Sequence, residues 1–316
     1  MENVPSEKAD LDLPQKDEEG DERDAEAEDN ATSPVDAEHL ADAPLVTSDA
    51  ELSFEEALTL TGRRGARLVM PMGEIGVGKT TVMVELWTQL VGVEAIGGYR
   101  CAGSRTAIAF EERAYLSRMA AGVGRRSTAR THYNENEGLL HMRVGQPDGE
   151  PLDLLFADYS GERYEHVREG TAAELELPWA PRADRILLVV NGAALGASNT
   201  CEIETDRASR LLHAVAAAEL VRTGARVAVL VARDDEVDDD ALKAARARLD
   251  ALLATARDLD AGAVLLRVAA RPKSGESPQG FEELLDWICS DDPPPDPSPV
   301  AIPRGERAIA RLGERP

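Results

Sequence analysis

The stretch "RLVMPMGEIGVGKTTVMVEL", residues 67–86, decides the fold of this chain. An apolar run over 67–72 breaks into a glycine-rich turn, and an amphipathic segment follows from Lys79. The residues from Gly73 to Thr80 fit the pattern G-x-x-x-x-G-K-[ST], in which glycines let backbone N–H groups converge on phosphate oxygens. The motif requires a strand before it and a helix after it, and both flanking patterns are present. The stretch therefore predicts a phosphate-binding loop for a nucleotide.

The side chains of this loop have separate expected roles. Lys79 is predicted to reach the β and γ phosphates and to take part in catalysis, and the Thr80 hydroxyl to bind Mg²⁺ at the start of a helix. Thr81 is expected to turn a second hydroxyl toward the α phosphate. The alternative is a glycine-rich turn that only packs. The residues predicted to contact the nucleotide here are Gly73, Glu74, Ile75, Gly76, Val77, Gly78, Lys79, Thr80 and Thr81.

Strand-like and helix-like patterns alternate along the rest of the chain, as is typical of a parallel sheet covered by helices. Six strands are predicted, at residues 66–71, 138–145, 152–158, 185–191, 225–232 and 263–270. Helical patterns cover residues 53–62, 78–91, 161–177, 201–224, 238–259 and 280–290. The second and third strands are joined by a turn too short for a crossover helix, so they should be antiparallel neighbours.

The predicted fold is therefore α/β: a mostly parallel six-stranded sheet with one antiparallel edge strand and helices on both faces. One additional segment, residues 93–137, separates the first helix after the phosphate-binding loop from the second strand. It holds a helical pattern over 106–121 and then an arginine-rich stretch, which is more chain than a simple loop needs.

Composition divides the 316 residues into three parts. Residues 1–50 hold 17 acidic and 3 basic residues, and this acidic, aromatic-free segment is predicted to be a disordered tail. Residues 51–290 form the predicted nucleotide-binding domain, and 291–316 a proline-rich disordered tail. The net charge of −24 argues against nonspecific nucleic-acid binding. No apolar run is long enough to span a membrane, so the expected location is the cytoplasm.

A second motif follows the third predicted strand. In "LLFADYSGERY", residues 154–164, a buried strand ends at Asp158, and Gly161 stands three residues later. An acidic residue at this strand end can hold Mg²⁺ through water, and the glycine can offer its N–H to the γ phosphate. Asp158 is therefore predicted as a metal ligand and Gly161 as a catalytic residue.

From residue 67 to 290 the chain resembles the GTPases of the Ras and G-alpha superfamily, since it has their phosphate-binding loop, the D-x-x-G motif and the same order of elements. The resemblance implies a base-reading motif, N-K-x-D or T-K-x-D, after the fifth strand, where residues 232–235 read "ARDD". Asp235 would accept hydrogen bonds from guanine, and the stem of Arg233 would cover the base. Ala269 and Ala270 would offer backbone contacts from the last loop. Ala232 departs from the pattern, and "ARDDEVDDD" is otherwise interpreted as a solvated acidic start of a helix.

The catalytic positions also depart from the superfamily. Glu162 stands where many of these GTPases carry the glutamine that orients the attacking water, and its carboxylate repels the γ phosphate, so slow intrinsic hydrolysis is expected. Arg125 and Thr128 have the Arg-x-x-Thr spacing of the first switch of G-alpha proteins. By that resemblance, Arg125 would be an arginine finger supplied in cis and Thr128 a ligand of Mg²⁺.

A narrower resemblance is carried by "AGSRTAIAFEERAYLSR", residues 102–118, together with "LLHMRVG" and "DYSGERY". These phrases are similar to the bacterial double-GTPase family of the second type. Members occur in multi-gene systems thought to act in biological conflict, beside another GTPase and a GTPase-activating-like component. The resemblance therefore implies those two classes of protein partner.

The sequence as a whole predicts a GTPase-like switch that binds GTP or GDP with Mg²⁺. Its first switch would lie in 122–137 and its second in 158–170, both ordered by the γ phosphate. Neither a nucleic acid nor a membrane is an expected partner. Two alternatives stay open: an ATP-binding P-loop enzyme, because of Ala232, and a nucleotide-bound interaction scaffold without hydrolysis, because of Glu162.

Overall fold

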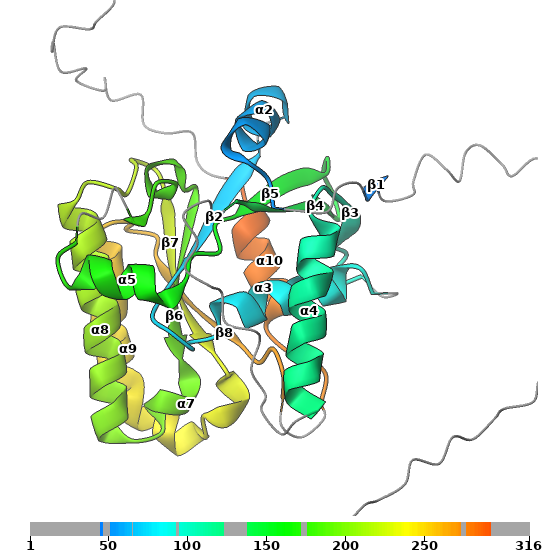
Figure 1. The fold of residues 1–316 in the computed structure, drawn as a ribbon. Coiled ribbons are helices and arrows are strands. Elements are labelled where there is room, and N and C mark those ends of the chain that lie inside the picture. The colour runs from blue at the N-terminus through cyan, green and yellow to red at the C-terminus, as the bar shows by residue number, and fades with distance from the viewer. Residues whose placement is uncertain are drawn as a thin grey trace, which may run out of the picture. The chain divides into compact units, whose positions relative to one another are not determined.

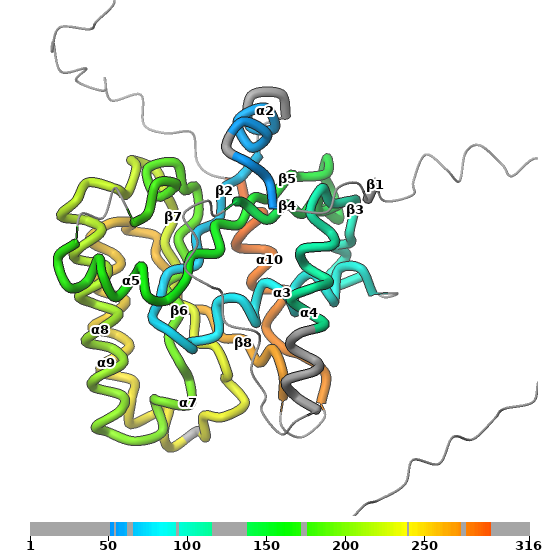
Figure 2. Tube along the Cα trace, in the orientation of Figure 1, coloured from blue at the N-terminus to red at the C-terminus, as the bar shows by residue number. Residues whose placement is uncertain are grey.

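A computed structural model describes residues 45–46, 51–64, 66–92, 95–122, 138–171, 176–272 and 276–291, whose elements are coloured in Figure 1. Figure 2 follows the Cα trace as a tube in the same orientation. These residues form an eight-stranded sheet in the order β1-β3-β4-β5-β2-β6-β7-β8. The strands are β1 (Leu45–Val46), β2 (Arg67–Met72), β3 (Arg100–Ser104), β4 (Leu140–Gly145), β5 (Leu152–Phe156), β6 (Arg185–Asn191), β7 (Arg226–Ala232) and β8 (Val264–Val268). The predicted fold class, α/β with a mostly parallel sheet, is confirmed.

Two details of the predicted sheet are wrong. The sheet has eight strands rather than six, and the antiparallel strand, β4, is not at an edge because β3 and β1 continue the sheet beyond it. β3 belongs to the additional segment, and its sequence "RCAGS" has no run of β-branched residues that would mark a strand. Its pairing with β4 shifts register between Cys101 and Gly103. Tertiary pairing, rather than local propensity, makes this segment a strand.

Helices cover both faces of the sheet (Figure 1). One face packs against α2 (Phe54–Arg64), α5 (Gly161–Arg168), α8 (Ser198–Ala217) and α9 (Asp239–Arg257). The other packs against α3 (Lys79–Leu90), α4 (Ala107–Gly122) and α10 (Phe281–Cys289). Three short helices, α7 (Gly192–Leu195), η1 (Ala180–Arg182) and η2 (Asp234–Glu236), lie in connections. Among the described residues, no helix combines the length and the apolar character needed to cross a bilayer.

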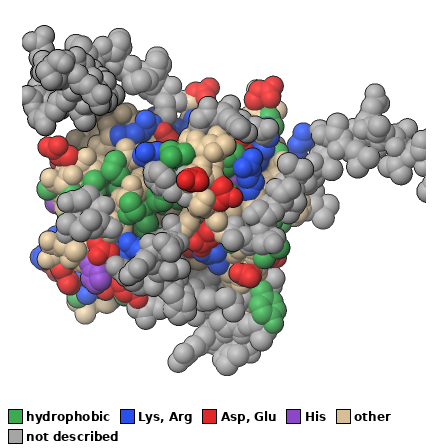
Figure 3. Space-filling model, turned by 45° about the horizontal axis from the view of Figure 1, so that its top comes forward, with side chains coloured by type: hydrophobic (Ala, Val, Ile, Leu, Met, Phe, Trp, Pro, Cys, Tyr) green, Lys and Arg blue, Asp and Glu red, His purple; other side chains and the backbone are tan. Residues whose placement is uncertain are grey.

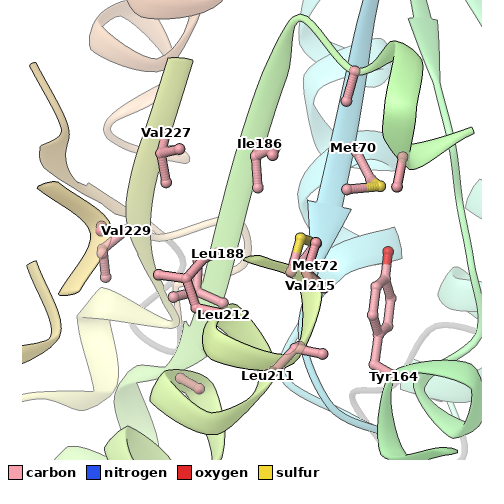
Figure 4. Packing of buried hydrophobic residues seen from close by; sticks show 14 of the residues in the cluster. Met70, Met72, Tyr164, Ile186, Leu188, Leu211, Leu212, Val215, Val227 and Val229 are labelled. Carbon is pink, nitrogen blue, oxygen red and sulfur yellow. The ribbon is translucent and has the colours of Figure 1, made fainter. Parts of the chain in front are cut away.

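The two cores follow from the alternation of side chains along the central strands, since successive residues of a strand point to opposite faces. Ile186 and Leu188 of β6 pack with Leu211, Leu212 and Val215 of α8 (Figure 4). The residues between them on β6, Leu187 and Val189, pack instead with α3 and α10. Continuous apolar strands of this kind are expected in a sheet that is buried on both faces.

The end of α10 is held by two arginines from the starts of strands on the sheet. Arg185, which is fully buried, donates to the carbonyls of Trp287 at 3.2 Å and Ser290 at 2.6 Å. Arg67 donates to the carbonyls of Ile288 at 2.5 Å and Ser290 at 3.0 Å. The last carbonyls of a helix have no partner inside it and carry partial negative charge, so cations are favoured there. This double cap joins α10 to β2 and β6.

Strand direction positions the functional residues. β2, β5, β6, β7 and β8 are mutually parallel, so their carboxyl ends meet at one edge of the sheet. In open α/β sheets, ligands bind in the crevice outside that edge. The loops at this edge carry the residues that the sequence motifs single out.

Candidate nucleotide-binding site

The phosphate-binding loop runs from the end of β2 to the start of α3, as its sequence predicts. Gly73, Gly76 and Gly78 have positive φ angles of 151°, 77° and 112°, which residues with side chains rarely adopt. A Cβ atom on Gly73 would lie 2.7 Å from the carbonyl oxygen of Val189 in β6. Backbone geometry and close packing thus both require glycine, and the loop brings bare backbone to the N-terminus of α3.

Lys79 is the first residue of α3, and its ammonium group is folded back over the loop. Its Nζ atom donates to the carbonyls of Gly73 at 2.8 Å and Glu74 at 3.1 Å, and it lies 5.1 Å from the centre of the Tyr164 ring. The side chain is buried, with an exposed fraction of 7%. A buried cation next to the backbone N–H groups of a glycine-rich loop attracts an anion such as a phosphate.

Thr80 and Asp158, the two predicted metal ligands that lie in the described residues, are in contact. The Thr80 hydroxyl donates to Asp158 Oδ1 at 3.0 Å, and the Asp158 side chain is 2% exposed. Burial raises the pKa of Asp158, while the positive charges of Arg113 and Lys79 act in the opposite direction. The pair offers a hydroxyl and a carboxylate oxygen at the start of a helix, a donor set that suits a hard divalent cation such as Mg²⁺.

Gly161 and Glu162 begin α5 beside the loop. A Cβ atom on Gly161 would lie 2.5 Å from both the Cα and the N atom of Ile75, so this glycine touches the loop backbone directly. Glu162 occupies the first turn of α5 and is half-buried. The structure therefore brings the D-x-x-G motif and the phosphate-binding loop together.

Beside the loop lies a pocket of about 210 Å³ between the start of α3 and the ends of β7 and β8. Arg233 and Asp235, which the sequence predicts as base-contacting residues, line it together with Thr81 and Gly78. Arg233 adopts a left-handed conformation, φ 55°, and its Nη2 atom donates to the Gly76 carbonyl at 3.4 Å. The motif after β7 is thereby tied to the phosphate-binding loop. The other lining residues are Val82, Ala232, Glu236, Ala270 and Arg271.

The two residues predicted to offer backbone contacts to a base have different positions. Ala270 lines the pocket, as does Arg271. The Ala269 N–H donates to the Gln279 carbonyl, and the Ala269 carbonyl accepts from the Gln279 N–H, both at 3.1 Å. The N–H of Ala269 is therefore engaged within the chain, and Ala269 is not among the residues that line the pocket.

Other predicted residues have different positions. The backbone of Glu74 belongs to the loop, but its buried carboxylate turns to Arg168 Nε of α5 at 2.5 Å and Arg207 Nη1 of α8 at 3.5 Å. Val77 is buried in the core under the loop, so only its backbone faces a ligand. Arg125 and Thr128, with the whole arginine-rich stretch, lie outside the described residues.

Arg113 is not among the site residues predicted from the sequence. This α4 residue is an ion-pair partner of Asp158, with Nε and Oδ2 separated by 3.4 Å, and it also pairs with Glu51. A signal was present: Arg113 shares the buried stripe of α4 with Ala109, Phe110 and Ala114. A charged residue on an apolar helical stripe indicates a buried ionic partner, although the partner cannot be identified from one sequence.

The residues present fit a nucleoside triphosphate with Mg²⁺. The glycine-rich loop between β2 and α3 presents backbone without side chains at Gly73, Gly76 and Gly78, and the cation of Lys79 lies over this loop. Thr80 and Asp158 supply oxygen ligands, and the adjoining pocket has room beside the loop for a base. On the face shown in Figure 3, acidic and basic side chains of the described residues are interspersed over the surface.

Among the 137 chains of solved structures that match this chain are three of low sequence identity. A bacterial selenocysteine-specific elongation factor is 15% identical with a TM-score of 0.37, and the match covers 71% of this chain and 28% of that one. The signal recognition particle receptor complex of Chaetomium thermophilum is 15% identical with a TM-score of 0.40, and the match covers 71% of this chain and 97% of that one. A GTP-binding protein of the archaeon Sulfolobus solfataricus, solved with GDP, is 13% identical with a TM-score of 0.38, and the match covers 74% of this chain and 54% of that one. These similarities carry no conclusion about what this chain binds.

The search of curated proteins returned no match. A family model described as double-GTPase 2 matches residues 67–288, well over half of the chain, from the phosphate-binding loop to the end of α10. The match includes both motifs, the additional segment and the pocket beside the loop. The chain therefore belongs to the double-GTPase 2 family.

Proposed function

We propose that this GTPase-like nucleotide-binding protein is a switch that binds GTP and GDP with Mg²⁺. The observation that carries the proposal is the pocket of about 210 Å³, which joins the phosphate-binding loop to Asp235 and Arg233. Asp235 supplies a carboxylate that can accept two hydrogen bonds, the pattern that the N1–H and exocyclic amino group of guanine present. Adenine presents no such pair of donors at those positions.

Different residues of the chain bind different parts of the nucleotide. The glycine loop and Lys79 bind and neutralise the phosphates, and Thr81 lies where the loop meets the pocket. Thr80 and Asp158 hold Mg²⁺, which neutralises negative charge on the phosphates when bound. Gly161 brings the start of α5 against the loop, so an arriving γ phosphate acts on the second switch directly.

Intrinsic hydrolysis is slow in this proposal because of Glu162. A carboxylate in the first turn of α5 cannot donate a hydrogen bond to water or phosphate while it is ionised, and it repels the phosphate charge. A partner protein then completes the site. The partner classes implied by family membership are a second GTPase and a GTPase-activating-like component, in a bacterial conflict system within the cytoplasm.

The test is a titration of the purified protein with fluorescent GDP, GTP and ATP analogues in Mg²⁺. We expect guanine nucleotides to bind at least about tenfold more tightly than ATP, because loss of a hydrogen-bonded pair in a pocket costs about 1–3 kcal/mol. Asp235→Asn should remove most of this preference. The control is Asp240→Asn, which makes the same charge change on an exposed residue at the start of α9.

One observation favours ATP binding as the second candidate. The position that carries Asn or Thr in the base-reading motifs is Ala232, which is buried against Gly78 and has no polar side-chain atom. Equal binding of ATP and GTP, unchanged by Asp235→Asn, would replace the guanine proposal with a P-loop ATPase.

A further inference from the structure

One arginine serves two carboxylates beside the metal ligands. The guanidinium of Arg113 places Nε 3.4 Å from Asp158 Oδ2 and pairs through Nη2 with Glu51, while Nη1 donates to the Ala109 carbonyl of its own helix at 3.1 Å. Asp158 is 2% exposed and Glu51 is 33% exposed. Asp158 is thus the more strongly desolvated of the two carboxylates that share this cation.

Glu51 carries the network from the metal ligands to the start of β4. Its second carboxylate oxygen accepts a hydrogen bond from the Gly138 N–H at 3.0 Å. The neighbouring residues, Leu52 and Leu139, exchange two backbone hydrogen bonds at 2.8 and 3.0 Å. Gly138 directly follows residues 123–137, which hold all but the first residue of the predicted first switch, 122–137. One chain of contacts therefore runs from Thr80 through Asp158, Arg113 and Glu51 to Gly138.

The charges in this network make the two contacts of Arg113 compete with each other. A single positive charge lies between two negative ones, and a second cation on Asp158 repels the guanidinium at short range. With the metal ion bound, the balance of attraction favours the pair of Arg113 with Glu51. Without the metal ion, the buried carboxylate of Asp158 attracts the guanidinium more strongly, because no divalent charge opposes that attraction.

We propose that Arg113 is a positioning residue whose guanidinium is exchanged between Asp158 and Glu51, so that metal binding at Asp158 tightens the contact of residues 51–52 with residues 138–139. The metal half of this inference rests on the proposed function. Coupling between two sites is reciprocal. A partner that pulls Glu51 away therefore lowers the affinity for the metal ion, and the bound metal ion lowers the affinity for that partner by the same factor. The residues before α2 thereby become a control point for the nucleotide site.

The first experiment needs no nucleotide. Hydrogen exchange of the Leu52 and Leu139 amides is measured relative to core amides of β6 and β7 in the full-length protein. Asp158→Asn, which removes the competing charge, should slow exchange at both amides, whereas Glu51→Gln and Arg113→Met should speed it. Arg113→Lys keeps the charge but loses the planar guanidinium that contacts both carboxylates, so it should also speed exchange at both amides. This variant replaces Arg113→Met if that variant does not fold.

The matched control is Glu55→Gln, an exposed change of the same charge in the first turn of α2. It should leave both amides at the wild-type rate. Exchange in Asp158→Asn that equals or exceeds the wild-type rate would overturn the proposal, because the guanidinium would then not be shared.

The second experiment measures the free Mg²⁺ concentration that half-maximally slows release of fluorescent GDP. Glu51→Gln should raise this concentration by at least about fivefold, the low end of coupling between linked sites. In an Arg113→Met background the same change should have no effect, since Glu51 acts only through the arginine. A Glu51→Gln effect that persists in that background would overturn the proposal. If the wild-type protein retains no GDP, the proposed function fails, while the exchange experiment still decides whether the charge is shared.

Discussion

Gly161 shows how little space separates the second switch from the phosphate-binding loop. Its Cα stands where any added carbon would overlap the backbone of Ile75, and that backbone cannot move without disturbing the neighbouring glycines of the loop. Ile75 itself is 41% exposed at the tip of the loop. At the scale of single residues, the site thus depends on its glycines as much as on the side chains of Lys79, Thr80 and Asp158.

Gly161→Ala is predicted to push the start of α5 away from the loop. Overpacking of this kind costs about 1–3 kcal/mol of folding stability. It should also reduce the ratio of GTP to GDP affinity, because the γ phosphate meets a displaced switch. Thermal unfolding and nucleotide titration measure the two effects. Gly196→Ala is the control, since its Cβ would find only an ordinary contact at 3.7 Å; equal effects in both variants would contradict the prediction.

Glu162→Gln is predicted to raise the rate of GTP hydrolysis. The amide removes a negative charge next to the γ phosphate and adds a hydrogen-bond donor that can orient water. We expect an increase of at least about tenfold in single-turnover hydrolysis, since a positioned acid or base contributes roughly 10²–10⁴-fold. Glu165→Gln, one turn further along α5, makes the same charge change and should leave the rate unaltered. A slower reaction in Glu162→Gln would mean that the carboxylate itself assists catalysis.

At the scale of elements, α10 depends on contacts with distant strands. It has nine residues, and its last carbonyls are satisfied by arginines that stand more than 100 residues earlier in the chain. A short helix has little stability of its own, so packing and capping decide whether it forms. The double cap of Arg67 and Arg185 therefore belongs to the fold rather than to the nucleotide site.

Arg185→Met is predicted to destabilise the protein by about 2–4 kcal/mol. The methionine fills similar space but leaves the Ser290 and Trp287 carbonyls without the buried donor. The shift of the denaturation midpoint measures the loss, and nucleotide affinity of the remaining folded protein should stay at the wild-type value. The control is Arg257→Met on the exposed last turn of α9, where the loss should stay below about 1 kcal/mol, the usual contribution of an exposed cation at a helix end. A loss below about 1 kcal/mol for Arg185→Met would show that Arg67 alone caps the helix.

At the scale of the whole molecule, the residues that the structure describes form two hydrophobic cores, with members from Leu52 to Cys289. The family match covers residues 67–288. The division into an acidic segment over 1–50, a domain over 51–290 and a proline-rich segment over 291–316 stays a prediction. It places all the stability of the protein in the middle part.

A fragment of residues 45–291 is therefore predicted to unfold within about 2 °C of the full-length protein, because a shift of that size corresponds to less than about 1 kcal/mol in a domain of this length. Calorimetry of the two proteins at equal concentration tests the prediction. A fragment that is less stable by more than about 5 °C would place part of the fold in the terminal segments.

Features encoded by neighbouring residues could be predicted from the sequence, whereas features that depend on contacts between residues far apart in the sequence could not. The phosphate-binding loop, Asp158 and Gly161 could be found because each belongs to a contiguous motif next to a strongly patterned strand. β3 could not be, since "RCAGS" becomes a strand only through its pairing with β4. Arg113 and Glu51 stand 62 residues apart, and their meeting beside Asp158 results from the packing of α4, which local patterns do not encode.

The position of α10 late in the sequence has a consequence during synthesis of the protein. Val82 and Leu86 of α3 share a core with Leu284 and Ile288, residues that are synthesised about 200 positions later. At about 5–20 residues per second, translation leaves that face of α3 without its cover for about 10–40 s. The nascent chain thus exposes an apolar helix throughout most of its synthesis, and holdase chaperones that recognise such surfaces have a defined period in which to bind it.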